Sequence, residues 1–264
     1  MHYSLSNKVY IVTGGSRGFG LSMAKALLAA GASVGITGRS KDSMQQAIEI
    51  LTAEHDDYRD RVCGELADVA DSGQVEQAFD NIVQRFGRLD GLVNNAGLAR
   101  VASTENMVDE EIKLQINTNL LGVVYCCRMA IRYLREVDNG RIINISSATA
   151  YHHDEMVHMA VYAATKSAVE RFSRDLRREL EGDAIGVSII RPGASMATDF
   201  SAGLDFDRLG DALKAWQDLG PHTYDGMEPE HVADAVVYCL SCPPGLAIDL
   251  LEIRPHHKID KVVF

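Results

Sequence analysis

Seven short apolar runs alternate with longer amphipathic stretches along the whole chain. The runs have the length of strands, and several are rich in Val and Ile without polar alternation, which is typical of strands buried on both faces. They occupy residues 8–13, 33–37, 61–66, 89–95, 140–146, 185–191 and 247–253, and the amphipathic stretches occupy 18–30, 41–54, 71–86, 105–136, 161–181 and 229–241. Alternation of this kind predicts βαβ units and a parallel α/β sheet of about seven strands with helices on both faces.

The chain is expected to form a single domain. Its 264 residues suit one α/β domain or two small ones, and no repeat, low-complexity tract or Pro/Gly-rich linker divides it. Segment 194–228 is long for a connection between a strand and a helix, and it mixes Gly with apolar residues. We expect a lid or substrate loop here, because open α/β sheets bind ligands beyond the carboxyl ends of their strands. A pair of packed surface helices is the alternative.

The charge of the chain argues against two classes of partner. A formal net charge of −11 disfavours nucleic acid and an anionic membrane surface as main partners, because phosphate binding needs clustered cations. No apolar run approaches the roughly 18 residues that span a bilayer. The N-terminal sequence enters a strand-like run almost at once, without a basic region followed by an apolar signal core, so we expect a cytoplasmic protein.

The five cysteines do not indicate a disulfide framework or a metal site. Their number is odd and they are scattered through apolar segments, which favours reduced thiols in the core. Cys239 and Cys242 form a CxxC, but no second pair accompanies it, and the surrounding residues are typical of the end of a buried helix.

Three glycines lie between the first apolar run and the first helical stretch. Gly14, Gly18 and Gly20 are spaced as GxxxGxG, which approximates the general dinucleotide-binding fingerprint GxGxxG. Glycines allow the backbone to approach a pyrophosphate closely, and the N-terminus of the following helix attracts anions. The order of strand, glycine loop and helix predicts a dinucleotide site, with a purely structural turn as the alternative.

The residues after the second apolar run favour NADP(H) over NAD(H). An NAD site usually has an acidic residue at this position to bind the ribose hydroxyls. This chain has Gly38 there, followed by Arg39 and Ser40, and Arg17 lies in the glycine loop. Two guanidinium groups and a hydroxyl suit a 2′-phosphate, which a carboxylate would repel.

Tyr162 and Lys166 are four residues apart in a helical stretch and therefore share one helix face. A phenol has a pKa of about 10, so it exchanges protons poorly near neutrality. A neighbouring ammonium favours the phenolate and lowers that pKa, and a shift of about 3 units corresponds to about 4 kcal/mol. We expect Lys166 to lower the pKa of Tyr162, which would then act as a proton donor and acceptor.

Taken together, these motifs resemble the short-chain dehydrogenase/reductase family over nearly the whole chain. The matching segments, in the order of the family, are TGGSRGFG (13–20), DV (68–69), NNAG (94–97), TNLLG (118–122), INISS (143–147), YAATK (162–166) and RPG (191–193). The resemblance implies a doubly wound Rossmann fold and hydride transfer between a nicotinamide and a carbonyl compound or an alcohol.

The same resemblance assigns four catalytic residues. Tyr162 would be the general acid in reduction, and Lys166 would lower its pKa and hydrogen-bond the nicotinamide ribose. Ser147 would polarise the substrate oxygen, although Ser146 is an alternative. Asn119 would hold a water that links Lys166 to bulk solvent.

The resemblance and the residue patterns together give a predicted set of cofactor-binding residues. Thr198 comes late after RPG, relative to the threonine that contacts the carboxamide in the family. The set comprises Gly14, Ser16, Arg17, Gly18, Phe19, Gly20, Arg39, Ser40, Asp68, Val69, Asn95, Ala96, Gly97, Tyr162, Lys166, Pro192, Gly193 and Thr198.

The function predicted from the sequence is an NADP(H)-dependent oxidoreductase that acts on a small-molecule ketone, aldehyde or alcohol. A catalytically silent NADP(H)-binding sensor with the same fold is the alternative. His152 and His153 form no ready chelate, so we expect no metal, and a place near the substrate fits them better. The family resemblance implies a homo-oligomer, a tetramer or a dimer, formed by the long helices at 105–136 and 161–181.

Overall fold

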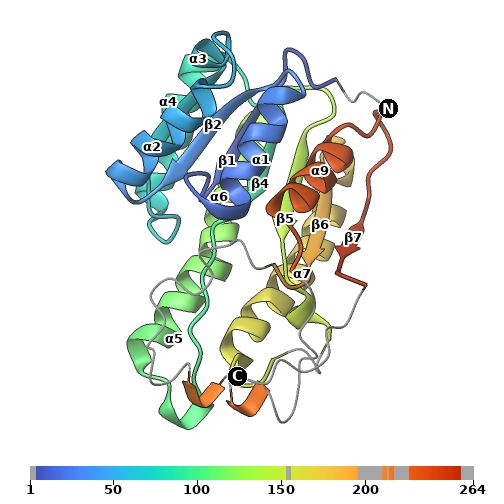
Figure 1. Ribbon diagram of the computed structural model, residues 1–264. Coiled ribbons are helices and arrows are strands. Elements are labelled where there is room, and N and C mark those ends of the chain that lie inside the picture. The colour runs from blue at the N-terminus through green and yellow to red at the C-terminus, as the bar shows by residue number, and fades with distance from the viewer. Residues whose placement is uncertain (1–3, 153–155, 196–209, 213, 217–225, 257–264) are drawn as a thin grey trace.

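The seven apolar runs form the seven strands of one parallel sheet in the computed structural model (Figure 1). The model describes residues 4–152, 156–195, 210–212, 214–216 and 226–256. The strands are β1 (Val9–Thr13), β2 (Ser33–Gly38), β3 (Val62–Leu66), β4 (Gly91–Asn94), β5 (Arg141–Ile145), β6 (Gly186–Pro192) and β7 (Leu250–Ile253). They are arranged in the order β3-β2-β1-β4-β5-β6-β7, and every neighbouring pair is parallel. The predicted fold class is confirmed.

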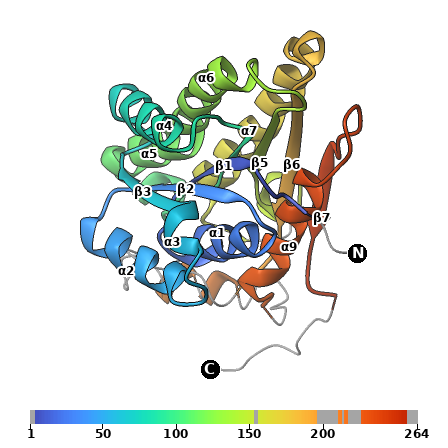
Figure 2. The same ribbon diagram turned by 90° about the horizontal axis from the view of Figure 1, so that it is seen from above.

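Helices cover both faces of the sheet, as Figure 2 shows. One face carries α1 (Gly18–Ala29), α2 (Lys41–Thr52) and α9 (Pro229–Leu240), and the other carries α4 (Ser72–Phe86), α6 (Gly122–Leu134) and α7 (Ala160–Glu179). Two apolar clusters result, one between the sheet and each layer of helices. Because β1, β4 and β5 are buried along their whole length, their apolar runs lack polar alternation.

The sheet has a switch point between β1 and β4. From β1 the chain moves outward to β2 and β3, and it then returns to build β4 to β7 on the other side. The loops that leave β1 and β4 therefore diverge from neighbouring strand ends, which is where doubly wound sheets bind ligands. This arrangement brings the glycine loop to the same edge of the sheet as the segments that follow β4, β5 and β6.

The predicted helix over 105–136 is interrupted. The structure has a 3₁₀ turn (Thr104–Asn106), helix α5 (Asp109–Ile116), a π-helical turn (Asn117–Leu121) and then α6. Apolar periodicity does not reveal one extra residue in a turn, so a continuous helix was expected. Single π turns inside helices are frequent at functional sites, and this one contains Asn119. A short helix, α3 (Tyr58–Arg61), was also not expected.

Segment 194–228 is attached to the domain at several described points. Met227 donates its backbone N–H to the carbonyl of Ala194 at 3.0 Å, and the Ser195 hydroxyl donates to the carbonyl of Met227 at 2.7 Å. Residues 210–212 and 214–216 are helical. The indole N–H of Trp216 donates to the carbonyl of Val157 at 2.7 Å, so this helical stretch contacts the segment before α7.

Within the described part of the chain, no helix is both long and apolar enough to cross a membrane.

Arg141, the first residue of β5, binds the loop after α9 at the amino ends of the strands, away from the glycine loop. Its buried guanidinium donates to the carbonyls of Leu246 (2.7 Å), Cys242 (3.0 Å) and Pro243 (3.0 Å), which follow the C-terminus of α9. One charged side chain thus supplies donors to three carbonyl groups of the loop between α9 and β7. Burial lowers the pKa of Arg141, because desolvation disfavours the charged form.

We expect Arg141→Met to lower the free energy of unfolding by about 2–4 kcal/mol, because it removes charged hydrogen bonds and leaves buried carbonyls without donors. Denaturant unfolding followed by circular dichroism measures the change. Arg135→Met is the control, since Arg135 is an exposed arginine paired with Asp183 at 2.9 Å and such pairs contribute below about 1 kcal/mol. Equal losses in the two variants would contradict the assignment.

Candidate active site

Four of the predicted residues converge beyond the ends of β4 and β5. Tyr162 and Lys166 lie in the first turns of α7 and are 8% and 4% exposed. The Lys166 ammonium is 5.8 Å from the centroid of the Tyr162 ring and donates to the carbonyl of Ile145 at 2.9 Å. Asn119 and Lys166 flank Gly97, because a Cβ at Gly97 would lie 3.3 Å from both Asn119 Oδ1 and Lys166 Nζ. The structure therefore brings Asn119 and Lys166 together at Gly97, with the Tyr162 ring near the same ammonium.

The two serines after β5 have different surroundings. Ser147 is half-buried and hydrogen-bonds the Tyr162 side chain. Its hydroxyl also accepts from the Thr149 hydroxyl at 3.0 Å. Ser146 is buried, and its hydroxyl donates to Glu170 Oε1 at 2.8 Å. The Ser147 hydroxyl is therefore the one that contacts Tyr162, whereas the Ser146 hydroxyl is used by Glu170.

Asn119 is fully buried in the π turn and is held by its neighbours. Its amide nitrogen donates to the carbonyl of Leu98 (2.8 Å) and to the Thr165 hydroxyl (3.1 Å), and its oxygen accepts from the Leu98 N–H (2.9 Å). These bonds use both donors and one of the two lone pairs of the amide oxygen. One acceptor position of the amide oxygen remains for the water that the family resemblance implies at Asn119.

The expected lowering of the Tyr162 pKa is wrong for this structure. Burial raises the pKa of Tyr162 to about 12, and the hydrogen bond with Ser147 only partly offsets this rise. Burial also lowers the pKa of Lys166 to about 8. The physical reason is that both groups are desolvated, which disfavours the phenolate and the ammonium alike. At neutral pH the phenol therefore keeps its proton, as an ordinary phenol does, and burial makes it a weaker acid than a phenol in water.

The glycine loop has the shape of a phosphate cradle. Gly14 has a φ of +63°, and a Cβ at Gly20 would lie 2.2 Å from the Gly14 carbonyl oxygen, so a larger residue would not fit at Gly20. No side chain caps the N-terminus of α1, and its first turn contains no acidic residue. The loop and helix therefore fit the pyrophosphate of a dinucleotide.

Predicted and unpredicted residues together hold the glycine loop against β4. The Asn95 side chain donates to the carbonyls of Thr13 (3.0 Å) and Gly14 (3.2 Å). The Thr13 hydroxyl accepts from the backbone N–H groups of Asn95 and Ala96, both at 3.1 Å. Thr13 was not predicted as a site residue; the only signal was a hydroxyl at the last position before the glycine loop.

The residues after β2 and β3 lie near each other. Arg39 is exposed, and its guanidinium is 3.7 Å from Asp68. The Ser40 hydroxyl accepts from the Ser43 N–H at 3.2 Å and thereby caps α2. A Cβ at Gly38 would lie 3.2 Å from the Ser16 hydroxyl, so Ser16 of the glycine loop faces the end of β2. This side of the site combines Arg39 with the exposed Arg17 of the same loop.

The remaining predicted cofactor residues border the same edge of the sheet. Val69 is buried and lies against Gly122, and Pro192 ends β6. The Gly193 N–H donates to the carbonyl of Ile253 at 2.8 Å. Gly18 and Phe19 begin α1. Thr198 lies outside the described residues.

His152 makes protein contacts that the sequence did not specify. Its Nε2 is 2.7 Å from Glu252 and 3.0 Å from an Arg254 nitrogen, which ties the segment before α7 to the end of β7. His153 lies outside the described residues. Among the residues that the structure describes, no three His, Cys, Asp or Glu side chains gather as a metal site.

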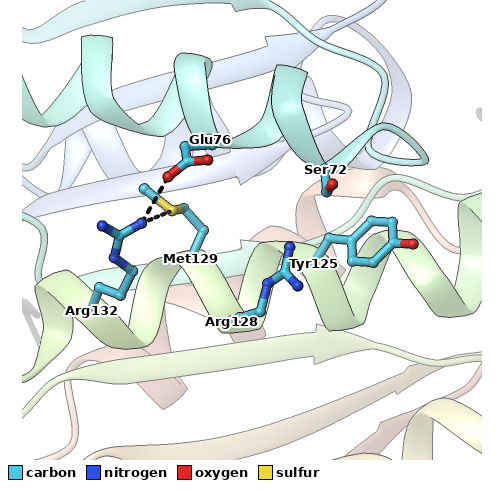
Figure 3. A pocket seen from close by; sticks show the side chains of 6 residues that line it. All are labelled: Ser72, Glu76, Tyr125, Arg128, Met129 and Arg132. Atoms are coloured by element: carbon cyan, nitrogen blue, oxygen red, sulfur yellow. Dashed lines mark hydrogen bonds and ion pairs between the residues drawn. The ribbon is translucent and has the colours of Figure 1, made fainter.

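A surface pocket between α4 and α6 contains none of the predicted residues (Figure 3). Ser72 and Glu76 project into it from α4, and Tyr125, Arg128, Met129 and Arg132 project from α6. Its arginines contact protein groups: Arg132 lies 2.9 Å from Glu76, and the Arg128 guanidinium lies 5.4 Å from the Tyr125 ring centroid. Its lining contains no lysine, so it lacks the combination of Tyr162, Ser147 and Lys166.

Comparison with known proteins is consistent with this geometry. Residues 8–208 match the family model for short chain dehydrogenases. A 3α-hydroxysteroid dehydrogenase of Mediterraneibacter gnavus is 32% identical, with 91% of this chain and 92% of that protein covered. A 3-oxoacyl-[acyl-carrier-protein] reductase of Chlamydia trachomatis is 35% identical, with coverage of 90% and 91%.

A solved structure supports the same conclusion. The closed form of a serine dehydrogenase complexed with NADP+ superimposes with a TM-score of 0.80 at 30% identity, with 93% of this chain and 94% of that chain covered. The family match, these relatives and the seven-stranded sheet lead to one conclusion. The chain belongs to the short-chain dehydrogenase/reductase family and is an oxidoreductase of that family.

Proposed function

We propose that this protein is an NADP(H)-dependent oxidoreductase that interconverts a ketone or aldehyde with the corresponding alcohol. The observation that carries the proposal is the meeting of Ser147, Tyr162 and Lys166 at the sheet edge where the glycine loop emerges. A binding protein needs the glycine loop alone, whereas the buried phenol and ammonium serve proton transfer.

Tyr162 is the proton donor in reduction. As negative charge develops on the carbonyl oxygen, the protonated phenol transfers its proton to that oxygen, and the Ser147 hydroxyl supplies a second hydrogen bond to it. Preplaced donors in a desolvated site stabilise this charge without reorganisation at the moment of reaction. The nearby Lys166 ammonium favours the phenolate that remains after the transfer.

The residues on the glycine-loop side fit a nicotinamide dinucleotide. Gly14 and Gly20 with the N-terminus of α1 would hold the pyrophosphate, Lys166 the nicotinamide ribose, and Pro192 and Gly193 the ring. Such a cofactor supplies or accepts the hydride when bound.

The charges around the end of β2 support NADP(H) as the preferred cofactor. Arg39 follows the end of β2, Arg17 lies in the glycine loop, and both are exposed, while Gly38 stands where an NAD site usually has a carboxylate. The Arg39 guanidinium is 3.7 Å from Asp68, which is too long for a hydrogen bond. The serine dehydrogenase with the same fold was crystallised with NADP+.

The described surroundings of Tyr162 favour a substrate with an apolar body. Ala99, Val101, Met159 and Ala212 form a buried cluster with Tyr162, and Trp216 packs against it. Apolar surroundings of this kind suit a carbonyl compound whose remaining surface is mainly hydrocarbon, and the described members of the cluster carry no charge that would bind a carboxylate. The name of one relative, a 3α-hydroxysteroid dehydrogenase, agrees with this class more closely than a serine dehydrogenase does.

We further propose a cytoplasmic homo-oligomer, a tetramer or a dimer. Ile116 at the end of α5 and Leu121 at the end of the π turn are more than a third exposed, which suits a contact between copies of α5 and α6. Small-molecule substrates remain the main partners, and neither nucleic acid nor a membrane is proposed.

We expect Tyr162→Phe to retain NADPH binding and to lower kcat by about 10²- to 10⁴-fold, because the variant keeps the ring and loses the proton donor. NADPH fluorescence gives the Kd, and absorbance of NADPH with a panel of apolar ketones gives kcat. Tyr125→Phe on α6 is the control and should behave as wild type. If wild type binds NADPH but reduces none of the carbonyl compounds, the silent-sensor alternative is supported.

Arg39→Gln should weaken NADPH binding by about 10- to 100-fold, the effect of losing a charged hydrogen bond of about 1.5–3 kcal/mol. NADH binding should stay within about threefold of wild type, because NADH has no 2′-phosphate. Isothermal titration calorimetry with each cofactor measures both values, and Arg59→Gln on the surface of α3 is the matched control. An equal loss for NADPH and NADH would contradict the cofactor assignment.

The rate of ketone reduction should fall as pH rises through about 8. The pKa of Lys166 is lowered to about 8, so its ammonium is present below that pH and is lost above it. We expect kcat at saturating NADPH to follow this titration, and Ser147→Ala to have a lower kcat with the same midpoint. A kcat that stays constant up to about pH 10 would show that the Lys166 charge is not required.

A further inference from the structure

A buried ion pair lies directly behind the proposed active site. Glu170 follows Lys166 by one helical turn on α7, and Arg191 is the penultimate residue of β6; each is 5% exposed. Arg191 binds Glu170 through two parallel hydrogen bonds, Nε to Oε1 at 2.8 Å and Nη2 to Oε2 at 2.6 Å. This bidentate geometry fixes the orientation of both side chains.

The stability of the fold does not by itself explain why Glu170 and Arg191 are buried as charged side chains. Desolvation of two charges offsets most of their attraction, and apolar residues of similar volume are often equally stabilising. The remaining polar groups of the pair also have partners. Arg191 Nη1 donates to Glu252 Oε2 on β7 at 2.6 Å. The result is a rigid connection across α7, β6 and β7.

Glu170 also binds Ser146, the residue that directly follows β5. The Ser146 hydroxyl donates to Glu170 Oε1 at 2.8 Å. Ser146 stands between Ile145, whose carbonyl accepts from the Lys166 ammonium, and Ser147, whose hydroxyl bonds Tyr162. The carboxylate therefore restrains the backbone that supplies both contacts to the reacting pair.

Arg191 extends the connection to the place proposed for the nicotinamide. It immediately precedes Pro192 and Gly193, and the Gly193 N–H is bonded to Ile253 of β7. Glu252 accepts from Arg191 and also contacts His152, which belongs to the segment that leads into α7. The pair thus lies where the end of β5, helix α7 and the residues proposed to contact the nicotinamide, Pro192 and Gly193, come together.

We propose that Glu170 and Arg191 are positioning residues that act through Ser146 to fix Ser147 and Lys166 relative to Tyr162. The inference rests on the proposed function, because it concerns the geometry of that reaction. Neither residue touches the reacting atoms. Displacement of a catalytic group by about 1 Å can lower the rate by about 10²-fold, so a small shift at Ser146 is sufficient for a measurable effect.

Ser146→Ala is the most selective test. It cuts the link between the ion pair and β5 but leaves both hydrogen bonds between Glu170 and Arg191, so no charge is left unpaired. We expect kcat to fall by about tenfold or more, with the Kd for NADPH within about threefold of wild type. Ser147→Ala should lose more, because Ser147 contacts the substrate oxygen and Ser146 does not.

A double-mutant cycle separates positioning from independent effects. Glu170→Gln alone should also lower kcat, and Ser146→Ala combined with Glu170→Gln should be little worse than Glu170→Gln, because both changes break the same link. Arg141→Met is the matched control: it removes a buried arginine at the opposite edge of the sheet, and we expect lower stability with unchanged kcat for the folded enzyme.

Backbone amide exchange provides a readout that does not depend on activity. Exchange within residues 144–150, measured by mass spectrometry, should be faster in Ser146→Ala and in Glu170→Gln than in wild type. Wild-type kcat and unchanged exchange in Ser146→Ala, or additive losses in the cycle, would overturn the positioning role. A wild type without carbonyl reductase activity would instead contradict the proposed function. Amide exchange would then still test whether Glu170 and Arg191 restrain the backbone at Ser146.

Discussion

The buried ammonium of Lys166 is the charge around which the site is organised. It is held by the carbonyl of Ile145 and lies over the ring of Tyr162, in surroundings that lower its pKa to about 8. The same desolvation raises the pKa of Tyr162 to about 12. Both groups are therefore mainly protonated at neutral pH, so the phenol has a proton to give and the neighbouring ammonium carries the charge that favours the phenolate left behind.

Much of the architecture could be predicted because its determinants are local. All seven strands follow from runs of apolar residues, and the glycine loop follows from residues that allow a tight turn beside a helix N-terminus. The four proposed catalytic residues lie in motifs whose order along the chain matches the order in the family. The parallel sheet then brings these distant motifs to one edge, as the alternation of strands and helices implies.

Other features depend on three-dimensional context and could not be read from the sequence. The π turn at Asn119 interrupts a helix whose apolar pattern is continuous. The direction of the Tyr162 pKa shift depends on burial, which exceeds the effect expected from spacing to Lys166 alone. The bond between Glu170 and Arg191 joins residues on a helix and a strand, and their identity as partners requires the packing of α7 against β6.

Site geometry and family membership lead to a single account, in which the dinucleotide, Tyr162 and Ser147 meet beyond the ends of β4, β5 and β6. The most direct test is a crystal structure of the protein with NADP+. The account predicts the pyrophosphate at the N-terminus of α1, Lys166 on the nicotinamide ribose, and the ring between Gly193 and Tyr162. A dinucleotide bound elsewhere, or Tyr162 and Lys166 directed away from it, would contradict the account.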